Sequence, residues 1–334
     1  MYKVSVVVPI HNVEKQIVRC AESLFQQTLD EIQFIFVDDA SPDKSVLLLE
    51  QTLERFPQRK NHTMILHHPR NMGLPAARAT GLKYVEAPYV AHCDSDDYVE
   101  PNMYEKLYEC AVQNGSDMVI CGRRIHCADG REYSESDKPI MEKSYLYSFL
   151  YGRLSASVWT RLTRTEIYRK VRFPTDNCLE DWVQTAQLLT YAPRTTVIPD
   201  CLYHYVQNPL SITNDMNQDV IKERIHQCIR NFYLMHDFIM ERHLAEEKDF
   251  IVKKTLIRFM YLPLIARWEI RREYLNTFPE INGCLLFDRN VSFQSKMTYL
   301  LVLLGLYPAA KKTCSFFRKQ RHSIKSKPDI GSGH

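Results

Sequence analysis

The 334-residue sequence predicts an α/β fold in which a doubly wound, mostly parallel sheet precedes a helical C-terminal region. Up to about residue 126, short β-branched apolar runs alternate with longer stretches whose apolar residues recur every three or four positions. Repeated β-α units of this kind form parallel sheets with right-handed crossovers. Beyond residue 215 only the helical spacing remains. We therefore expect a domain over 1–215, with halves 1–126 and 127–215, then helices over 216–322 and a flexible tail over 323–334.

The expected elements follow the chain in order. Strands are predicted over 4–9, 32–37, 63–67, 89–93 and 117–121, and helices over 14–27, 44–56, 74–86 and 102–114. After a polar segment at 127–143, helices are predicted over 145–150, 158–170 and from 180 or 181 to 189, then a strand pair at 196–198 and 203–206, then helices over 220–242 and 249–272. Residues 4–8 are continuously apolar, which is typical of a strand that is covered on both faces.

Composition and charge are those of an ordinary globular protein. The ten cysteines show neither a CxxC motif nor zinc-ligand spacing, which indicates a reduced, cytoplasmic setting. The first predicted strand begins near Lys3, which leaves no room for a signal peptide.

The most informative motif is Asp94-Ser95-Asp96, which comes directly after a predicted buried strand. Open α/β sheets bind ligands at the carboxyl ends of their strands. Two nearby carboxylates suit Mg²⁺ or Mn²⁺ that is held together with substrate phosphates. Taken alone, the motif fits a solvated acidic turn equally well.

A second acidic site, Asp39, follows the second predicted strand and would reach the same edge of the sheet. A carboxylate there could accept a hydrogen bond from a ribose hydroxyl or a base N–H. Ser41 and Asp43, next along the chain, are typical helix caps.

A third site lies at the entry to the helix predicted from residue 74. Asn71 and Gly73 form its turn, and free N–H groups at a helix start favour an anion. Arg78, one turn further on, could pair with phosphate, although a solvated surface arginine fits the pattern too.

A fourth site is the adjacent pair Glu180-Asp181 at the start of an apolar helix. Acidic residues at a helix N-terminus are favourable in any protein. In a catalytic site, one carboxylate could take a proton from an attacking hydroxyl while the other orients it.

Together these motifs resemble glycosyltransferase family 2, the inverting GT-A enzymes that use nucleotide-diphosphate sugars. The resemblance covers about residues 3–215 and includes the aromatic strand Tyr203-His204-Tyr205 and the loop Ser211-Ile212-Thr213. The sequence departs from the common pattern in two places. His11 replaces the usual tyrosine of the first motif, and residues 206–208 stand where an arginine often follows the aromatic strand.

The resemblance implies a role for each matching residue. Asp39 would contact the nucleobase, usually uracil, in a pocket that Pro9 and Asn71 line and to which His11 could contribute. Arg78 would lie against the base or diphosphate, Asp94 would meet the ribose, and Ser95 belongs to the same donor site. Asp96 would bind Mn²⁺ or Mg²⁺, and Asp181, beside Glu180, would be the catalytic base. Ser211 and Thr213 would lie in the family's loop, and His204 could reach the metal or diphosphate or be an ordinary packed histidine.

The function implied is transfer of a hexose or N-acetylhexosamine from a UDP-sugar to a glycan or lipid-linked acceptor in bacterial surface polysaccharide synthesis. Two alternative functions share some of these features. A sugar-phosphate nucleotidyltransferase would carry a glycine-rich loop after the first strand, and residues 9–14 contain no glycine. A non-catalytic sugar-nucleotide-binding subunit would not need Asp96 and Asp181, which are both present.

The C-terminal segment is distinct in charge, because residues 289–328 contain nine Lys or Arg and no acid. Residues 299–310 are apolar but too few to span a bilayer, which takes roughly 20 residues. Apolar and aromatic groups beside cations, as over 297–327, are typical of a segment that lies on anionic lipid at the inner face of the cell membrane. A core-packed helix with a solvated tail is the alternative. Nucleic-acid binding has no other support in the sequence.

Overall fold

A computed structural model of the chain describes residues 1–207, 217–262, 264 and 268–307. The chain divides into two compact units. The first comprises Met1–Asp215 and Glu223–Asp249, and the second comprises Met216–Lys222 and Phe250–His334. Ser211, Thr213 and the basic residues 311–327 lie outside the described residues.

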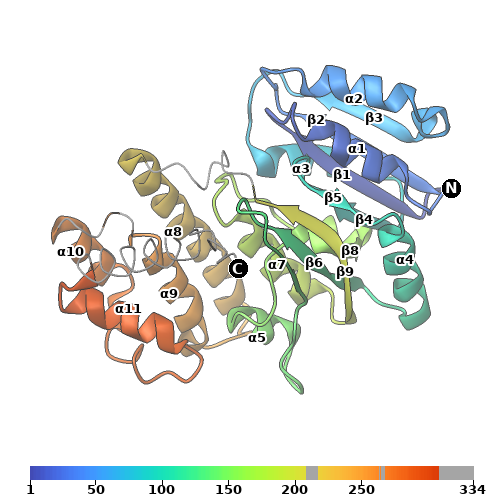
Figure 1. The fold of residues 1–334 in the computed structure, drawn as a ribbon. Coiled ribbons are helices and arrows are strands. Elements are labelled where there is room, and N and C mark those ends of the chain that lie inside the picture. Colours follow the sequence, from blue (N-terminus) through green and yellow to red (C-terminus); the bar gives the residue numbers. More distant parts are fainter. Residues whose placement is uncertain (208–216, 263, 265–267, 308–334) are drawn as a thin grey trace, which may run out of the picture. The chain divides into compact units, whose positions relative to one another are not determined.

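The first unit contains a sheet whose parallel part is built as the sequence predicts (Figure 1). β1 (Val4–Ile10) lies between β2 (Ile32–Asp38) and β4 (Tyr89–His92), and β3 (Thr63–His67) pairs with the outer side of β2. All of these pairings are parallel. Every residue of β1 and β2 is buried, because helices cover both faces of the sheet.

Helices on opposite faces make this sheet doubly wound. Val4, Val6 and Val8 of β1 belong to a core that also contains residues of α1 (Ile17–Phe25) and α4 (Met103–Asn114). The alternate face of β1 carries Val7 against Gly81 of α3 (Leu74–Leu82), where a side chain on residue 81 would collide with Val7. α2 (Ser45–Glu54) packs on α1, and a 3₁₀ turn, η1 (Pro57–His62), follows it.

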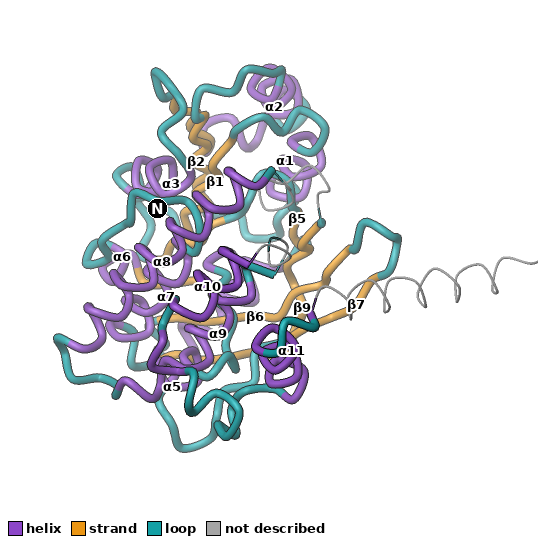
Figure 2. The backbone as a smooth tube through the Cα atoms, turned by 90° about the vertical axis from the view of Figure 1, so that its left-hand side faces the viewer, coloured by secondary structure: helices purple, strands orange, loops and turns teal. Residues whose placement is uncertain are grey.

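The other half of the sheet is mixed. The full strand order is β3-β2-β1-β4-β8-β6-β9-β5, and β7 (Glu132–Glu135) pairs with β6 (Met118–His126) beside this path. β8 (Arg161–Arg164) is antiparallel to β4 and β6, β9 (Thr195–Val206) is parallel to β6, and the short β5 (Tyr98–Val99) is antiparallel to β9. Figure 2 shows β6, β9 and β7 as neighbouring strands in this half.

Two sequence predictions in this half are wrong. The helix expected over 158–170 is instead η2 (Val158–Thr160), β8 and the short α6 (Thr165–Tyr168). Here strand pairing on both sides, to β4 and β6, outweighs the local helical spacing. The two strands expected near 196–206 are the single strand β9, whose register with β6 shifts around Gly122. A Cβ on Gly122 would come within 2.8 Å of Cys201 Sγ, so glycine permits the close approach there.

The helices that border the site are close to their predicted ranges. α5 (Tyr145–Leu150) and α7 (Glu180–Tyr191) lie in the first unit. α8 (Gln218–Met240) belongs mostly to that unit, and its Asn231 donates hydrogen bonds to the carbonyls of Asp176 and Cys178 at 3.0 and 2.7 Å. α8 therefore holds the chain segment that leads into α7.

The second unit is helical, as predicted for the C-terminal region. It contains α9 (Ile251–Phe259), α10 (Trp268–Asn276), the 3₁₀ turn η5 (Pro279–Ile281) and α11 (Phe293–Leu303), after the 3₁₀ turn η4 (Glu247–Phe250) at the boundary between the units. The single helix expected over 249–272 is wrong, because α9 ends at Phe259 and the sequence carries the helix breaker Pro263 before α10. No helix among the described residues is long and apolar enough to cross a membrane.

Candidate active site

The site lies where β1, β2 and β4 end at one edge of the sheet. Ile10 of β1 pairs with Asp38 of β2, and Val7 of β1 pairs with His92 of β4, so the loops that follow these strands are neighbours. Asn12 and Ala40, in two of these loops, both have φ of 55°. Left-handed backbone at non-glycine residues is costly and is concentrated at functional sites.

Asp39 is buried, with 3% of its surface exposed, and its carboxylate organises the turn before α3. Oδ1 accepts the Met72 N–H at 2.7 Å and Oδ2 accepts the Gly73 N–H at 2.8 Å, while His68 Nδ1 lies 2.7 Å from Oδ1. Gly73 has φ of 90°, and a Cβ there would come within 2.7 Å of Asn177 Oδ1. Asp39 therefore fixes this turn, and its contact with a nucleobase stays a prediction.

His11 links the first motif to the third. Its Nδ1 lies 3.0 Å from the Asp39 carbonyl oxygen, and its Nε2 lies 3.0 Å from Asn71 Nδ2. Because the carbonyl can only accept and the amide nitrogen can only donate, these partners select the neutral tautomer with the proton on Nδ1. Pro9 is buried at the end of β1 beside Val37. The structure thus brings Pro9, His11, Asp39 and Asn71 together, as the motifs predict.

Arg78 is the centre of the acidic part of the site, and only 1% of it is exposed. Its Nη2 donates to Asp94 Oδ1 at 2.7 Å, and its Nη1 donates to Asp181 Oδ1 at 2.9 Å and to Glu180 Oε1. One guanidinium therefore joins the loop after β4 to the first turn of α7. The resemblance implied contact with the base or diphosphate, whereas the contacts seen here are with carboxylates.

The adjacent acids Glu180 and Asp181 have different surroundings. Glu180 is 3% exposed and also accepts a hydrogen bond from Gln184 of the next turn, and burial raises its pKa well above the usual range against the opposing effect of Arg78. The Asp181 side chain is 26% exposed. Leu179, just before them, has φ of 58°. Glu180 is thus an internal anchor for Arg78, and Asp181 is the one of the pair that solvent reaches.

The loop over residues 94–97, which follows β4 and is called the acidic loop below, contains three aspartates with three different environments. Burial raises the pKa of Asp94, and the charge of Arg78 opposes this effect. Burial and then the charge of Asp94 raise the pKa of Asp96 to about 6. Apart from its own backbone N–H, none of the described residues donates a hydrogen bond to the Asp96 carboxylate. Ser95 between them is buried.

Asp97 is a structural part of the site that the sequence motifs do not single out. It is 1% exposed and accepts the Tyr203 hydroxyl at 2.9 Å and the Val206 N–H at 2.8 Å. Burial raises its pKa well above the usual range. The Tyr203 oxygen also accepts the Asp94 N–H at 3.1 Å. Asp97 and Tyr203 together fasten β9 to the acidic loop. The only hint in the sequence is the run Asp94-Ser95-Asp96-Asp97 after a buried strand.

The donor set fits a divalent cation held jointly with a nucleotide. The described part of the chain contains no group of three or more His, Cys, Asp or Glu side chains that could hold an ion by themselves. Mg²⁺ sites commonly use only one or two carboxylates and take their other ligands from phosphate and water. The Asp96 carboxylate, with which no other described side chain pairs, has the chemistry for that role, since a cation would offset its repulsion with Asp94.

His204 is buried in an aromatic stack. Its ring lies 4.2 Å from that of Tyr98 and 5.1 Å from that of His126, in stacked geometry. Its Nε2 lies 3.0 Å from Glu100 Oε1 and its Nδ1 lies 2.8 Å from His126 Nε2, and burial lowers its pKa. These contacts are those of the packed histidine, the second of the two alternatives.

Aromatic rings from β9 and η2 border the acidic loop. The Trp159 ring stacks on Tyr203 at 4.1 Å and on Tyr205 at 5.7 Å between centroids. Tyr205 is 37% exposed, and the charges of Asp97, Asp96 and Asp94 contribute to the rise in its pKa after the larger effect of burial. An exposed aromatic surface therefore adjoins the carboxylates.

The sheet and its acidic edge define a GT-A type glycosyltransferase. The solved structure of S. aureus TarS residues 1–349 in complex with UDP is similar, with a TM-score of 0.52 and 19% identity over 89% of this chain and 90% of that one. The mannosyltransferase PcManGT from Pyrobaculum calidifontis in complex with GDP-Man and Mn²⁺ gives a TM-score of 0.53 and 14% identity over 90% and 86%.

The chain belongs to glycosyl transferase family 2, whose model matches residues 5–181. It is 31% identical over 235 residues to the uncharacterized glycosyltransferase EpsJ of Bacillus subtilis (strain 168), which covers 67% of each chain. It is 33% identical over 210 residues to the minor teichoic acid biosynthesis protein GgaB of the same organism, which covers 61% of this chain and 23% of that protein. The family sets aside the nucleotidyltransferase alternative.

Proposed function

We propose that this protein is an inverting, metal-dependent glycosyltransferase that transfers a hexose or N-acetylhexosamine from a UDP-sugar in bacterial surface polysaccharide synthesis. The acceptor would be a glycan or a lipid-linked oligosaccharide. One observation carries the proposal: buried Arg78 holds Asp94 and Asp181 on the same guanidinium, and no other side chain among the described residues pairs with the Asp96 carboxylate. Relatives named for teichoic acid synthesis, and the TarS complexes with UDP and UDP-GlcNAc, support this donor and setting.

In this proposal the donor lies across the carboxyl edge of the sheet. Pro9, His11, Asn71 and the loop that Asp39 braces would enclose the nucleobase, and Asp94 with Ser95 would meet the ribose. Asp96 would hold Mn²⁺ or Mg²⁺, which when bound neutralises charge on the diphosphate. The PcManGT complex supports a metal at this kind of site.

Asp181 would act as the general base. The acceptor hydroxyl oxygen forms a bond to the anomeric carbon, the bond from that carbon to the diphosphate oxygen breaks, and the hydroxyl proton passes to Asp181 with inversion of configuration. Arg78 keeps the Asp181 carboxylate oriented, and Glu180 keeps Arg78 in place. Glu180 is therefore a positioning residue in this mechanism.

The test is Asp181→Asn, assayed with a panel of UDP-sugars and Mn²⁺. Transfer should fall by about a thousandfold, the usual size of a lost general base. Calorimetry should show UDP affinity in Mn²⁺ close to that of the parent protein, because Asp181 would face the acceptor. Asp129→Asn, at an exposed carboxylate that pairs with Arg131, is the control. Transfer at the parent rate, or UDP affinity lost with Asp181→Asn, would contradict the assigned role.

We further propose that the protein works in the cytoplasm at the inner face of the membrane, with residues 297–327 on anionic lipid. Exposed apolar side chains of α11 support this, since Phe293, Met297 and Leu303 are 78%, 40% and 39% exposed. Tyr299 and Val302 of the same helix are buried, so one part of α11 packs inside its own unit. Replacing Lys311, Lys312, Arg318, Lys319 and Arg321 by Ser should release the chain from phosphatidylglycerol liposomes, and undiminished binding would refute the idea.

A further inference from the structure

Tyr205 of β9 presents an exposed aromatic ring beside the acidic loop, and 37% of this residue is exposed. The backbone of β9 is held to the loop on either side of it. The Tyr203 hydroxyl donates to Asp97 at 2.9 Å, and the Val206 N–H donates to Asp97 at 2.8 Å. Side chains alternate along a strand, so Tyr205 and Tyr203 lie on the same face of β9. The exposed ring therefore lies on the face of β9 that meets the carboxylates.

Trp159 of η2 supports the Tyr205 ring. The two rings are parallel to within 1°, with their centroids 5.7 Å apart. Trp159 is 7% exposed, belongs to the hydrophobic core and stacks on the buried Tyr203 at 4.1 Å. A packed ring next to an exposed one fixes its orientation and lowers the entropic cost of binding there. The Tyr205 ring with Trp159 is therefore a rigid surface, called the aromatic surface below.

The aromatic surface and the nucleobase motifs lie on different sides of the acidic loop. Pro9 belongs to β1 and Asp39 follows β2, whereas the acidic loop follows β4. From β4 the strand order continues through β8 and β6 to β9. In the proposed function the base lies at β1 and β2 and the diphosphate lies at the acidic loop. This arrangement leaves the β9 side for the acceptor.

The side of α7 that carries Asp181 borders the segment that carries Trp159. Thr185 follows Asp181 by four positions, so the two residues lie on the same face of the helix. The Thr185 hydroxyl donates to the Ala156 carbonyl at 2.8 Å, and Ala156 comes three residues before Trp159. One face of α7 therefore connects the proposed base to the aromatic surface.

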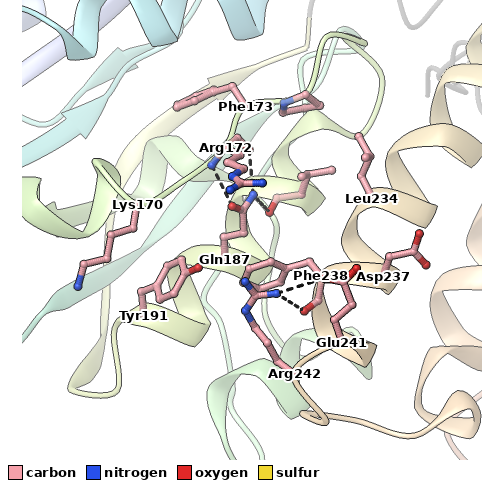
Figure 3. Close-up of a pocket in the computed structure, with 12 residues that line it drawn as sticks. Lys170, Arg172, Phe173, Gln187, Tyr191, Leu234, Asp237, Phe238, Glu241 and Arg242 are labelled. Carbon is pink, nitrogen blue, oxygen red and sulfur yellow. Dashed lines mark hydrogen bonds and ion pairs between the residues drawn. The ribbon is translucent and has the colours of Figure 1, made fainter.

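A cavity of about 550 Å³ lies on another side of α7 (Figure 3). Val183, Gln187 and Tyr191 are among the residues that line it. At about 100° per residue, Val183 is turned by roughly 160° from Asp181 around the helix axis. An acceptor that reacts at Asp181 would therefore meet the aromatic surface and not this cavity.

We propose that Tyr205, supported by Trp159, stacks on a pyranose ring of the acceptor and places its reacting hydroxyl near Asp181. The apolar C–H face of a pyranose can cover an aromatic ring while its hydroxyls stay free for polar groups. A polyol-phosphate chain has no such face, and the carboxylates of the acidic loop repel phosphate. The inference rests on the proposed function and narrows its acceptor to a chain of sugar rings.

The test is calorimetry on the full chain saturated with UDP and Mn²⁺. Three probes are pentasaccharides of β-linked glucose, N-acetylglucosamine and galactose, and the fourth is a glycerol-phosphate oligomer without rings. At least one pentasaccharide should bind roughly tenfold or more tightly than the ring-free oligomer, because only it has an apolar face. Tyr205→Ala should weaken that binding by roughly tenfold or more, the usual effect of losing an aromatic anchor. Tyr205→Phe keeps the ring and should restore most of the affinity.

The matched control is Tyr84→Ala, which removes a tyrosine of similar exposure, 45%, beyond the C-terminal end of α3. It should bind the pentasaccharides as the parent does. The inference would be overturned by equal affinity of Tyr205→Ala and the parent, by equal weakening in the control, or by a glycerol-phosphate oligomer that binds as tightly as the sugars.

UDP affinity in Mn²⁺ is measured first for every protein, which separates this inference from the proposed function. A parent protein that does not bind UDP would refute the proposed donor site. A parent that binds UDP but none of the pentasaccharides would refute the aromatic surface alone. Tyr205→Ala should bind UDP as the parent does, and a loss of UDP affinity in this variant would contradict the assignment of Tyr205 to the acceptor.

Discussion

Two charged regions border α7, and they differ in whether their charged side chains have ion-pair partners. At its N-terminus, Arg78 is 1% exposed and contacts three carboxylates, so the buried cation is compensated on every side. Along its length, Lys170 and Arg172 line a cavity and have no acidic partner in the described structure. The first region holds the proposed catalytic groups in position, and the second carries two cations that no described carboxylate pairs with.

The same contrast separates neighbours in the acidic loop. Asp97 is buried and bonded to Tyr203 and Val206, whereas the carboxylate of Asp96, one position earlier, accepts no hydrogen bond from any other described residue. Removing a charge from water costs several kcal/mol unless partners replace the solvent. A carboxylate kept partly buried without such partners is thus typical of a group whose partner arrives with the substrate.

The largest effect is expected from breaking the compensated region. Arg78→Met would leave Glu180, Asp181 and Asp94 without their shared cation, and loss of one partner from a buried ion pair typically costs about 3–5 kcal/mol. The free energy of unfolding, measured by urea titration, should fall by that amount. Adding Glu180→Gln should recover part of it, because a neutral amide needs no buried counter-charge.

Arg169→Met, at an exposed arginine without an ion pair among the described residues, is the control and should change stability by less than about 0.5 kcal/mol. If Arg78→Met were as stable as its control, the ion pairs of Arg78 with Asp94, Glu180 and Asp181 would not stabilise the fold. Arg78→Lys keeps the charge but loses the guanidinium, whose two terminal nitrogens reach Asp181 and Asp94 at once. This variant should therefore be more stable than Arg78→Met, while its rate of sugar transfer remains low.

The second prediction concerns pH and uses Asp96 without metal. Its folded pKa of about 6 lies above the value near 4 of an unfolded aspartate. The folded protein therefore binds more protons between these values, and stability is lost as pH rises from about 4 to 6. Asp96→Asn should remove this loss, so in EDTA the variant should gain up to about 2 kcal/mol on the parent across that interval, with allowance for partial exposure.

Chemical denaturation at several pH values measures this difference. If the free energy of unfolding changed with pH in the same way for parent and variant, the prediction that folding raises the pKa of Asp96 would be wrong. Mn²⁺ should stabilise the parent with UDP, more strongly above pH 6 than below it, since only the ionised carboxylate binds metal. The same addition should have little effect on Asp96→Asn.

The sequence predicts correctly those elements whose signals lie within the element itself. The strand at 63–67 and the helix at 145–150 coincide with β3 and α5, because their apolar patterns and boundaries lie within a few residues. The stretch 158–170 was predicted incorrectly, because β8 owes its strand conformation to its partners β4 and β6. Pairing between distant segments leaves no periodic trace in the segment itself.

The site shows the same limit. Motif residues Asp39, Asn71, Arg78, Asp94 and Asp181 do lie at one edge of the sheet, since strand ends and helix starts are recognisable locally. The contact of Arg78 with Glu180 joins positions 102 apart, and that of Tyr203 with Asp97 joins positions 106 apart. No spacing rule connects such pairs, so the motifs identify these residues without identifying their partners.

The smallest effect is expected from loosening Asp97 while its neighbours keep their places. Tyr203→Phe removes the hydroxyl that donates to Asp97 and accepts the Asp94 N–H, but it keeps the ring that stacks on Trp159. Loss of these two hydrogen bonds should cost about 1–2 kcal/mol of unfolding free energy in all. UDP affinity in Mn²⁺ should weaken only a few-fold, because Asp94 and Asp96 keep their carboxylates. Tyr205→Phe, whose exposed hydroxyl makes no hydrogen bond to the described residues, is the matched control. If both variants behaved like the parent, the Val206 N–H alone would suffice to hold Asp97. The position of Asp97 would then depend on the backbone of β9 and not on the Tyr203 hydroxyl.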